Sequence, residues 1–168
     1  MSRGAGFSLL EVMVVLSIMG ILVALAVPGF GYLAASTKVK GASTELYLAL
    51  IRARSESVKR NRGVQILATS GDETKWNEGW RVIADQNNDG DYDDVASDND
   101  RLITEQGELQ RVAITMAEDN VVYRPTGRIA NAAKPEFDIS SQDPEHDNLE
   151  RCVSADLTGK PYIKTEGC

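Results

Sequence analysis

The N-terminal part of the chain carries one carboxylate in an otherwise apolar run. From Phe7 to Val27 the only charged residue is Glu11. A charge deep in a bilayer costs about 2.5–3.5 kcal/mol even on mild insertion scales, so such residues tend to be functional and paired. The run contains no basic partner, so we expect Glu11 to be neutralised by a cation of another molecule.

An ordinary secretory signal peptide is the alternative interpretation of this segment. Arg3 supplies a positive charge, and Ala24-Leu25-Ala26 has the small-residue pattern of a cleavage site. The apolar run of about 21 residues is longer than a usual signal core and near the length that spans a bilayer. The internal acid also counts against a signal peptide.

Two cysteines, Cys152 and Cys168, could form a disulfide or remain free thiols. An N-terminus competent for export favours the disulfide. It would close a loop of roughly fifteen residues and stabilise the fold by about 3 kcal/mol. A zinc site is disfavoured because the chain has no other cysteine and only one histidine, His146.

An acidic stretch in the middle of the chain has the spacing of half a calcium loop. Asp85, Asn87, Asp89 and Asp91 alternate, with Gly90 at the sharp turn, as in an EF-hand. The bidentate glutamate is missing, because the twelfth position is Ala96. The alternative is a turn between strands whose Asp and Asn side chains bond their own backbone.

Catalysis and general nucleic-acid binding are both disfavoured. His146 lies in a polar, acidic stretch, and no nucleophile motif accompanies it. The net charge of −7 is a poor match to the phosphate backbone.

The elements that position these residues follow from periodicity. We predict one long helix from about Phe7 to Arg60, with Pro28 marking a kink or local melting. Its second half has an apolar face, and Asn61 and Gly63 are candidate terminators. That face consists of residues at three- and four-residue steps: Val39, Ala42, Leu46, Ala49, Leu50 and Ala53.

After the helix, short apolar runs separated by turns predict strands. A helix followed by strands indicates an α+β fold with antiparallel sheet packed on the helix. The predicted strands are 64–69, 79–84, 101–105, 109–115, 121–124, 137–140, 152–155 and 162–164.

The N-terminal residues Gly6-Phe7-Ser8-Leu9-Leu10-Glu11, followed by an apolar helix, resemble the class III signal of type IV prepilins. The resemblance implies that a prepilin peptidase cuts after Gly6 and that the new N-terminal Phe7 is methylated. Glu11 is then the fifth residue of the mature chain, where it serves subunit assembly.

The rest of the chain resembles the FimT/GspH group of minor pilins and minor pseudopilins. Three stretches carry the likeness, and they imply a helix packed against two antiparallel sheets, in which the acidic loop is a normal turn. They are the W-x-x-G-W strand at 76–80 with its D-x-N-x-D-G loop at 85–90, Ala53-Arg54-Ser55-Glu56, and Arg124-Pro-Thr-Gly127-Arg128.

Some members of the FimT branch take up DNA through a Gly-Arg-x-Arg motif. The matching stretch here, 159–164, keeps Gly159 and has the bases Lys160 and Lys164, but it contains no arginine. Because lysine does not pair bidentately with phosphate, DNA binding by these lysines is disfavoured.

The resemblance implies a minor pilin that helps initiate a type IV pilus at or near its tip. The H-type pseudopilin of type II secretion and a DNA receptor for transformation are the alternatives. The resemblance also implies a leader (1–6), a transmembrane and filament-core helix (7–29) and a periplasmic domain (30–168). Expected partners are other minor pilins, the major pilin, the prepilin peptidase and the inner-membrane assembly platform. The expected location is the bacterial inner membrane and then the pilus; no cofactor is expected apart from the calcium alternative.

Overall fold

A computed structural model describes residues 8–87, 89–92 and 100–168, with the backbone alone for 24–29. The chain divides into two compact units, residues 1–34 and residues 35–168. A single helix, α1 (Leu9–Arg60), contributes to both. Position 28 lies inside α1, so the helix does not melt at Pro28.

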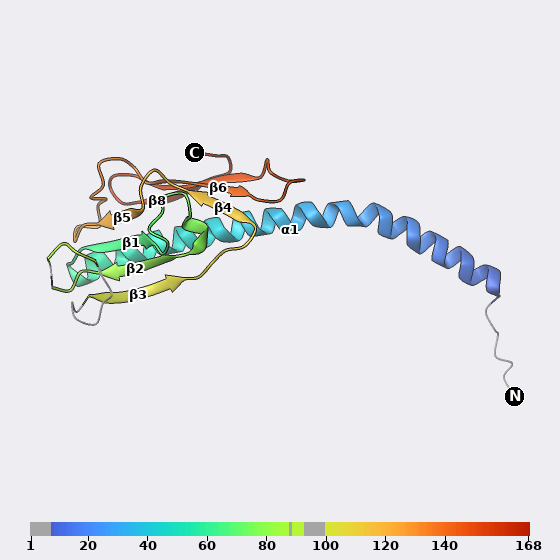
Figure 1. Ribbon diagram of the computed structural model, residues 1–168, viewed down its shortest axis with the longest axis horizontal. Coiled ribbons are helices and arrows are strands. Elements are labelled where there is room, and N and C mark those ends of the chain that lie inside the picture. The colour runs from blue at the N-terminus through green and yellow to red at the C-terminus, as the bar shows by residue number, and fades with distance from the viewer. Residues whose placement is uncertain (1–7, 88, 93–99) are drawn as a thin grey trace, which may run out of the picture. The chain divides into compact units, whose positions relative to one another are not determined.

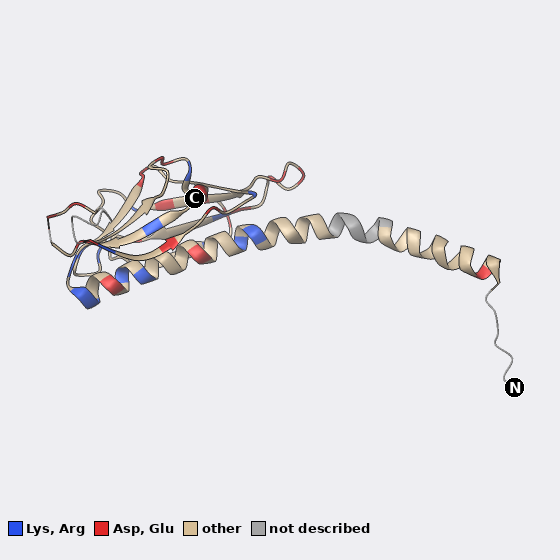
Figure 2. Cartoon of the chain, turned by 60° about the horizontal axis from the view of Figure 1, so that its bottom comes forward, with Lys and Arg blue, Asp and Glu red and all other residues tan. Residues whose placement is uncertain are grey.

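The second half of α1 supplies one wall of the domain core (Figure 1). The predicted apolar face is confirmed: Val39, Leu46, Leu50 and their neighbours at helical spacing are buried. Charged residues gather on this half of the helix, whereas the described N-terminal part carries a single acid (Figure 2). This distribution is that of an amphipathic helix on a folded domain.

Asn61 ends α1, and Gly63 does not. Asn61 takes the left-handed conformation (φ 51°), its N–H bonds the Val58 carbonyl, and the Arg62 N–H bonds the Ser57 carbonyl. These are the two bonds of a Schellman cap. Gly63 instead lies against Tyr92, since a Cβ there would be 2.3 Å from the Tyr92 hydroxyl.

In the part of the chain that the structure describes, eight strands form two antiparallel sheets, as the resemblance implies. Sheet A has the order β3-β2-β1-β5 and sheet B the order β4-β6-β7-β8. Their bounds are β1 (Val64–Ala68), β2 (Trp80–Ala84), β3 (Arg101–Gln106), β4 (Val112–Thr115), β5 (Asn120–Tyr123), β6 (Glu136–Ser141), β7 (Glu150–Ala155) and β8 (Pro161–Lys164).

Large aromatic side chains occupy the core of the domain. Trp76, in the short 3-10 helix η1 (Trp76–Glu78), meets Phe137 of β6 edge to face, with ring centroids 4.8 Å apart. Trp80 and Tyr123 are also fully buried. Both tryptophans therefore belong to the core.

Candidate functional site

The described N-terminal part of α1 is an apolar surface with one acid. All its large hydrophobic side chains from Leu9 to Val23 are 46–79% exposed. Glu11 lies in the first turn of the helix, where the helix dipole favours a carboxylate. Gly6 and Phe7 lie outside the described residues. This surface needs a cover, either lipid or other helices.

Within the part of the chain that the structure describes, no helix is long and apolar enough to cross a membrane. The transmembrane segment proposed for residues 7–29 therefore stays a prediction.

In the domain, three stretches far apart in the sequence meet around Arg54. Arg54 Nε donates to the Gly127 carbonyl oxygen at 3.2 Å, and Nη2 donates to the Thr158 carbonyl oxygen at 3.3 Å. The first turn follows β5, and the second joins β7 to β8. One side chain of α1 thus holds a turn from each sheet.

The two turns also touch each other through glycines. A Cβ on Gly159 would lie 1.9 Å from the Gly127 carbonyl oxygen, and one on Gly127 would lie 2.9 Å from Val58 of α1. Both glycines have positive φ, at 84° and 75°. A side chain at Gly159 would therefore require the backbone of the Gly127 turn to move, whereas one at Gly127 would press on the Val58 side chain.

Two titratable groups at this junction have shifted pKa values. The Thr158 hydroxyl and then the Lys160 backbone N–H bond the Asp156 carboxylate, and they lower its pKa. Burial raises the pKa of the Tyr123 hydroxyl above its ordinary value. We name the cluster of Arg54, Tyr123, Gly127, Asp156 and Gly159 the turn junction.

The A-R-S-E and R-P-T-G-R stretches therefore have a structural role, which sequence reasoning did not assign. The signal that could have revealed it is the pair of turn glycines later in the chain, Gly127 and Gly159.

Side chains of the acidic loop after β2 accept hydrogen bonds from the loop's own backbone. Asp85 is buried, and its Oδ2 accepts the Gly90 N–H at 3.2 Å. Asn87 Oδ1 accepts the Asp89 N–H, and Asp89 Oδ1 accepts the Asp91 N–H. These are the bonds that the turn alternative predicts.

The described residues contain no group of three acidic, histidine or cysteine side chains that could hold a metal ion. Asn88, Asp93 and Asp94 of the loop lie outside those residues. Calcium binding by Asp85, Asn87, Asp89 and Asp91 stays a prediction.

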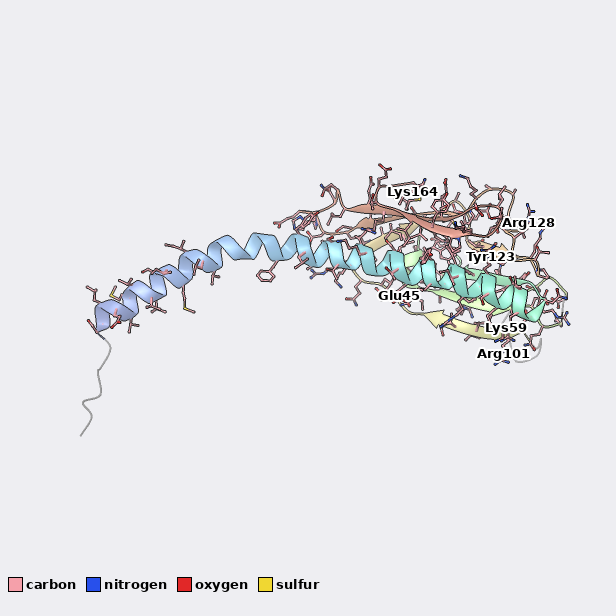
Figure 3. The ribbon with its side chains drawn as sticks, turned by 180° about the vertical axis from the view of Figure 1, so that it is seen from behind. Glu45, Lys59, Arg101, Tyr123, Arg128 and Lys164 are labelled. Carbon is pink, nitrogen blue, oxygen red and sulfur yellow. A yellow bond between two sulfur atoms is a disulfide. The ribbon has the colours of Figure 1, made fainter. Side chains whose placement is uncertain are left out.

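The two lysines of the DNA prediction differ in setting. Lys160 is exposed in the turn beside the turn junction. Lys164 is half-buried on β8, with Nζ 5.9 Å from the Tyr162 ring centre, and Figure 3 shows it on the side of the domain away from α1. DNA binding by this pair stays a prediction. His146, in the loop before β7, is half-buried.

The predicted disulfide is confirmed. Cys152 and Cys168 are bonded, with their Cα atoms 4.9 Å apart. The bond ties the segment after β8 to the buried strand β7.

Residues 42–159 match the family described as type II transport protein GspH, which is most of the domain. The chain belongs to the GspH family. Residues 1–27 also match the prokaryotic N-terminal methylation motif, so both parts of the chain are accounted for. No match was found among curated protein sequences.

Solved structures of the same fold include a type IV minor pilin and a minor pseudopilin. The chain matches the type IV minor pilin FimU of Pseudomonas aeruginosa with a TM-score of 0.60 and 18% identity, covering 76% of this chain and 89% of that one. It matches the minor pseudopilin EpsH of the type 2 secretion system of Vibrio cholerae with a TM-score of 0.54 and 12% identity, covering 76% and 97%.

This GspH-family chain is therefore a minor pilin or pseudopilin of the FimT/GspH type. Its families consist of structural subunits, and they imply a membrane-anchored protein with a periplasmic domain that assembles with other pilins or pseudopilins.

Proposed function

We propose that the chain is a minor pilin that helps initiate type IV pilus assembly and sits at or near the filament tip. The observation that carries the proposal is the exposed apolar helix surface with its single acid, within a methylation motif. Such a surface is stable only when lipid or other helices cover it. The protein works by packing, without catalysis.

Assembly begins with removal of the leader. Cleavage after Gly6 leaves the apolar helix in the inner membrane and creates an amine at Phe7. That amine, methylated by the peptidase, meets the Glu11 carboxylate of a neighbouring subunit. Pairing in trans offsets the cost of the buried acid and sets the register between subunits.

The H-type minor pseudopilin of type II secretion is the second candidate. The match to the GspH family and the fold shared with EpsH favour it. Its chemistry of cleavage and packing would be the same. Finding the chain in pili sheared from the cell surface would support the minor pilin and exclude this alternative.

The decisive experiment is the N-terminal residue and intact mass of the protein from membranes. We expect a start at N-methylated Phe7, with a mass that includes the Cys152–Cys168 bond. A start at Val27 would mean ordinary secretion with loss of Glu11, and the assembly proposal would fall.

A further inference from the structure

The edges of the two sheets are not equally protected. The outer side of β5 is bonded by the segment after it: the Ala130 N–H donates to the Val122 carbonyl, and Asn131 accepts the Val122 N–H. Strand β4 lies against η1. Strand β8 has four residues and begins with Pro161, which has no N–H to offer.

Strand β3 is the longer open edge. It forms one side of sheet A, next to β2 (Figure 1). Among the described residues, no backbone hydrogen bond joins 101–106 to anything but β2. A bulge between Val82 and Ile83 interrupts the ladder, so the regular part of the edge is Thr104–Gln106. Unpaired strand groups are a template for a further strand.

A groove of about 450 Å³ runs between this part of β3 and α1. Its helix side presents Leu48, which is 50% exposed, and Ile51, which is 39% exposed. Its strand side is Thr104, Glu105 and Gln106. The groove therefore offers apolar contacts directly beside the open backbone edge.

The same groove is acidic. Glu45 of α1 and Glu105 of β3 line it, and neither forms an ion pair of 4 Å or less with a described residue, although Arg81 of β2 is the cross-strand neighbour of Glu105. Figure 3 shows Glu45 on α1 beside β3. A neighbouring hollow of about 430 Å³ shares Glu45 and adds Glu108. Arg52 is the cation of the first hollow and Lys38 that of the second.

We propose that β3 and this groove receive an extended segment of a neighbouring filament subunit, which adds as a strand to sheet A. The inference rests on the proposed function, because the occupant is another subunit. Side chains of a strand alternate between its two faces. The residues of the incoming strand that lie beside Thr104 and Gln106 are therefore apolar, and they cover Leu48 and Ile51.

The residue between them stands opposite Glu105 and is lysine or arginine. Directly opposed residues on paired strands interact, favourably for opposite charges and unfavourably for like charges. The incoming segment therefore has an apolar–basic–apolar pattern.

The test is photo-crosslinking from the full chain in cells that carry its native assembly system. A photoreactive residue is placed at Gln106, and at Leu157 in the exposed turn after β7 as the control. We expect position 106 in sheared filaments to crosslink to one subunit, within a peptide that has the apolar–basic–apolar pattern. Position 157 does not give that peptide.

Charge reversal supplies the second readout. Glu105→Lys is expected to lower the crosslink yield from position 106 about tenfold, because an attraction becomes a repulsion. Glu145→Lys, on an exposed loop of sheet B, leaves the yield unchanged. Intact disulfide by mass, with unchanged resistance to protease, shows that each variant is folded.

The outcomes separate the inference from the proposed function. If the chain is in the filaments but position 106 gives no strand peptide, crosslinks a helix, or matches position 157, the inference is wrong and the function stands. An equal yield from Glu105→Lys also overturns it. If the chain is absent from filaments, the proposed function fails and the inference with it.

Discussion

Arg54 Nε donates a hydrogen bond to the carbonyl oxygen of Gly127 at 3.2 Å, which joins residues 73 positions apart. The same guanidinium bonds the Thr158 carbonyl, 104 positions away. Arginine can serve two acceptors at once because its donors form a rigid planar fork. The helix, sheet A and sheet B thus depend on one side chain at the turn junction.

Replacing Arg54 by alanine is expected to destabilise the protein by about 2–3 kcal/mol, because two charge-assisted hydrogen bonds are lost and two carbonyls lose their partner. The detergent-solubilised full chain can be unfolded in urea and followed by the fluorescence of the buried Trp76 and Trp80. Arg52→Ala, on the exposed side of the same helix, is the control and is expected to change stability by about 0.5 kcal/mol or less. Equal effects of the two variants would show that the junction contributes nothing.

Gly159 is expected to tolerate no side chain. Gly159→Ala places a Cβ 1.9 Å from the Gly127 carbonyl oxygen in addition to the strain of φ +84°. The matched control is Gly71→Ala, where φ is +67° and nothing lies within 4 Å. We expect about 1–2 kcal/mol for Gly71→Ala, from backbone strain alone.

Gly159→Ala is expected to cost several kcal/mol more, on the scale of about 4–5 kcal/mol that marks exceptional substitutions. The difference between the two variants in the urea midpoint isolates the steric clash. Similar midpoints would mean that the turn moves away at little cost.

Reduction of the disulfide is expected to lower the free energy of unfolding by about 3 kcal/mol, because the unfolded chain loses a cross-link. The loop spans a sequence separation of 16 residues. Urea unfolding with and without dithiothreitol measures the change. The Cys152→Ser/Cys168→Ser double variant serves as the control, since its midpoint must not respond to the reductant.

Stability is expected to fall in acid partly through Asp156. Its pKa is lowered in the folded protein, first by the Thr158 hydroxyl and then by the Lys160 N–H. A carboxyl whose folded pKa is depressed adds stability above its unfolded pKa of about 3.9, and that stability is lost as the pH falls through the folded value. Asp156→Asn keeps the shape without the charge, so its urea midpoint should fall less between pH 5 and 2 than that of the wild type. An equal fall would assign the acid sensitivity to other carboxyls, such as Glu56, whose pKa Arg60 lowers.

Calcium is expected to leave the stability unchanged, because the oxygens of Asp85, Asn87 and Asp89 already accept backbone hydrogen bonds. Urea unfolding in calcium and in a chelator tests this. A site present at 100 times its dissociation constant would add about 2.7 kcal/mol. A shift of that size would confirm the EF-hand-like alternative, and Asp89→Asn should then abolish it.

The elements of this fold were predictable from the sequence because each has a local cause. The buried face of α1 follows from residues such as Val39, Leu46 and Leu50 at helical spacing, and the strands follow from short apolar runs between turns. The disulfide followed from there being just two cysteines in a chain with an export signal. Glu11 was identified by its position in an apolar run, which needs no tertiary contact.

The cap of α1 shows where local signals fail. Both Asn61 and Gly63 suit a helix end, but Asn61 takes the left-handed position and Gly63 lies beyond it, against the Tyr92 side chain. Helix-end propensity only ranks Asn61 and Gly63 as candidates for the same capping position. Which of them caps the helix depends on packing with residues that are distant in the sequence.

The sequence by itself determined the helix, the strands and the N-terminal processing motif, because these depend on residues within a few positions of one another. Only the tertiary structure decided that Arg54, Gly127 and Gly159 meet, and that Glu45 and Glu105 line one groove. Those contacts depend on strand order and register across separations of about 30 to more than 100 residues, and a stretch read alone carries no such information.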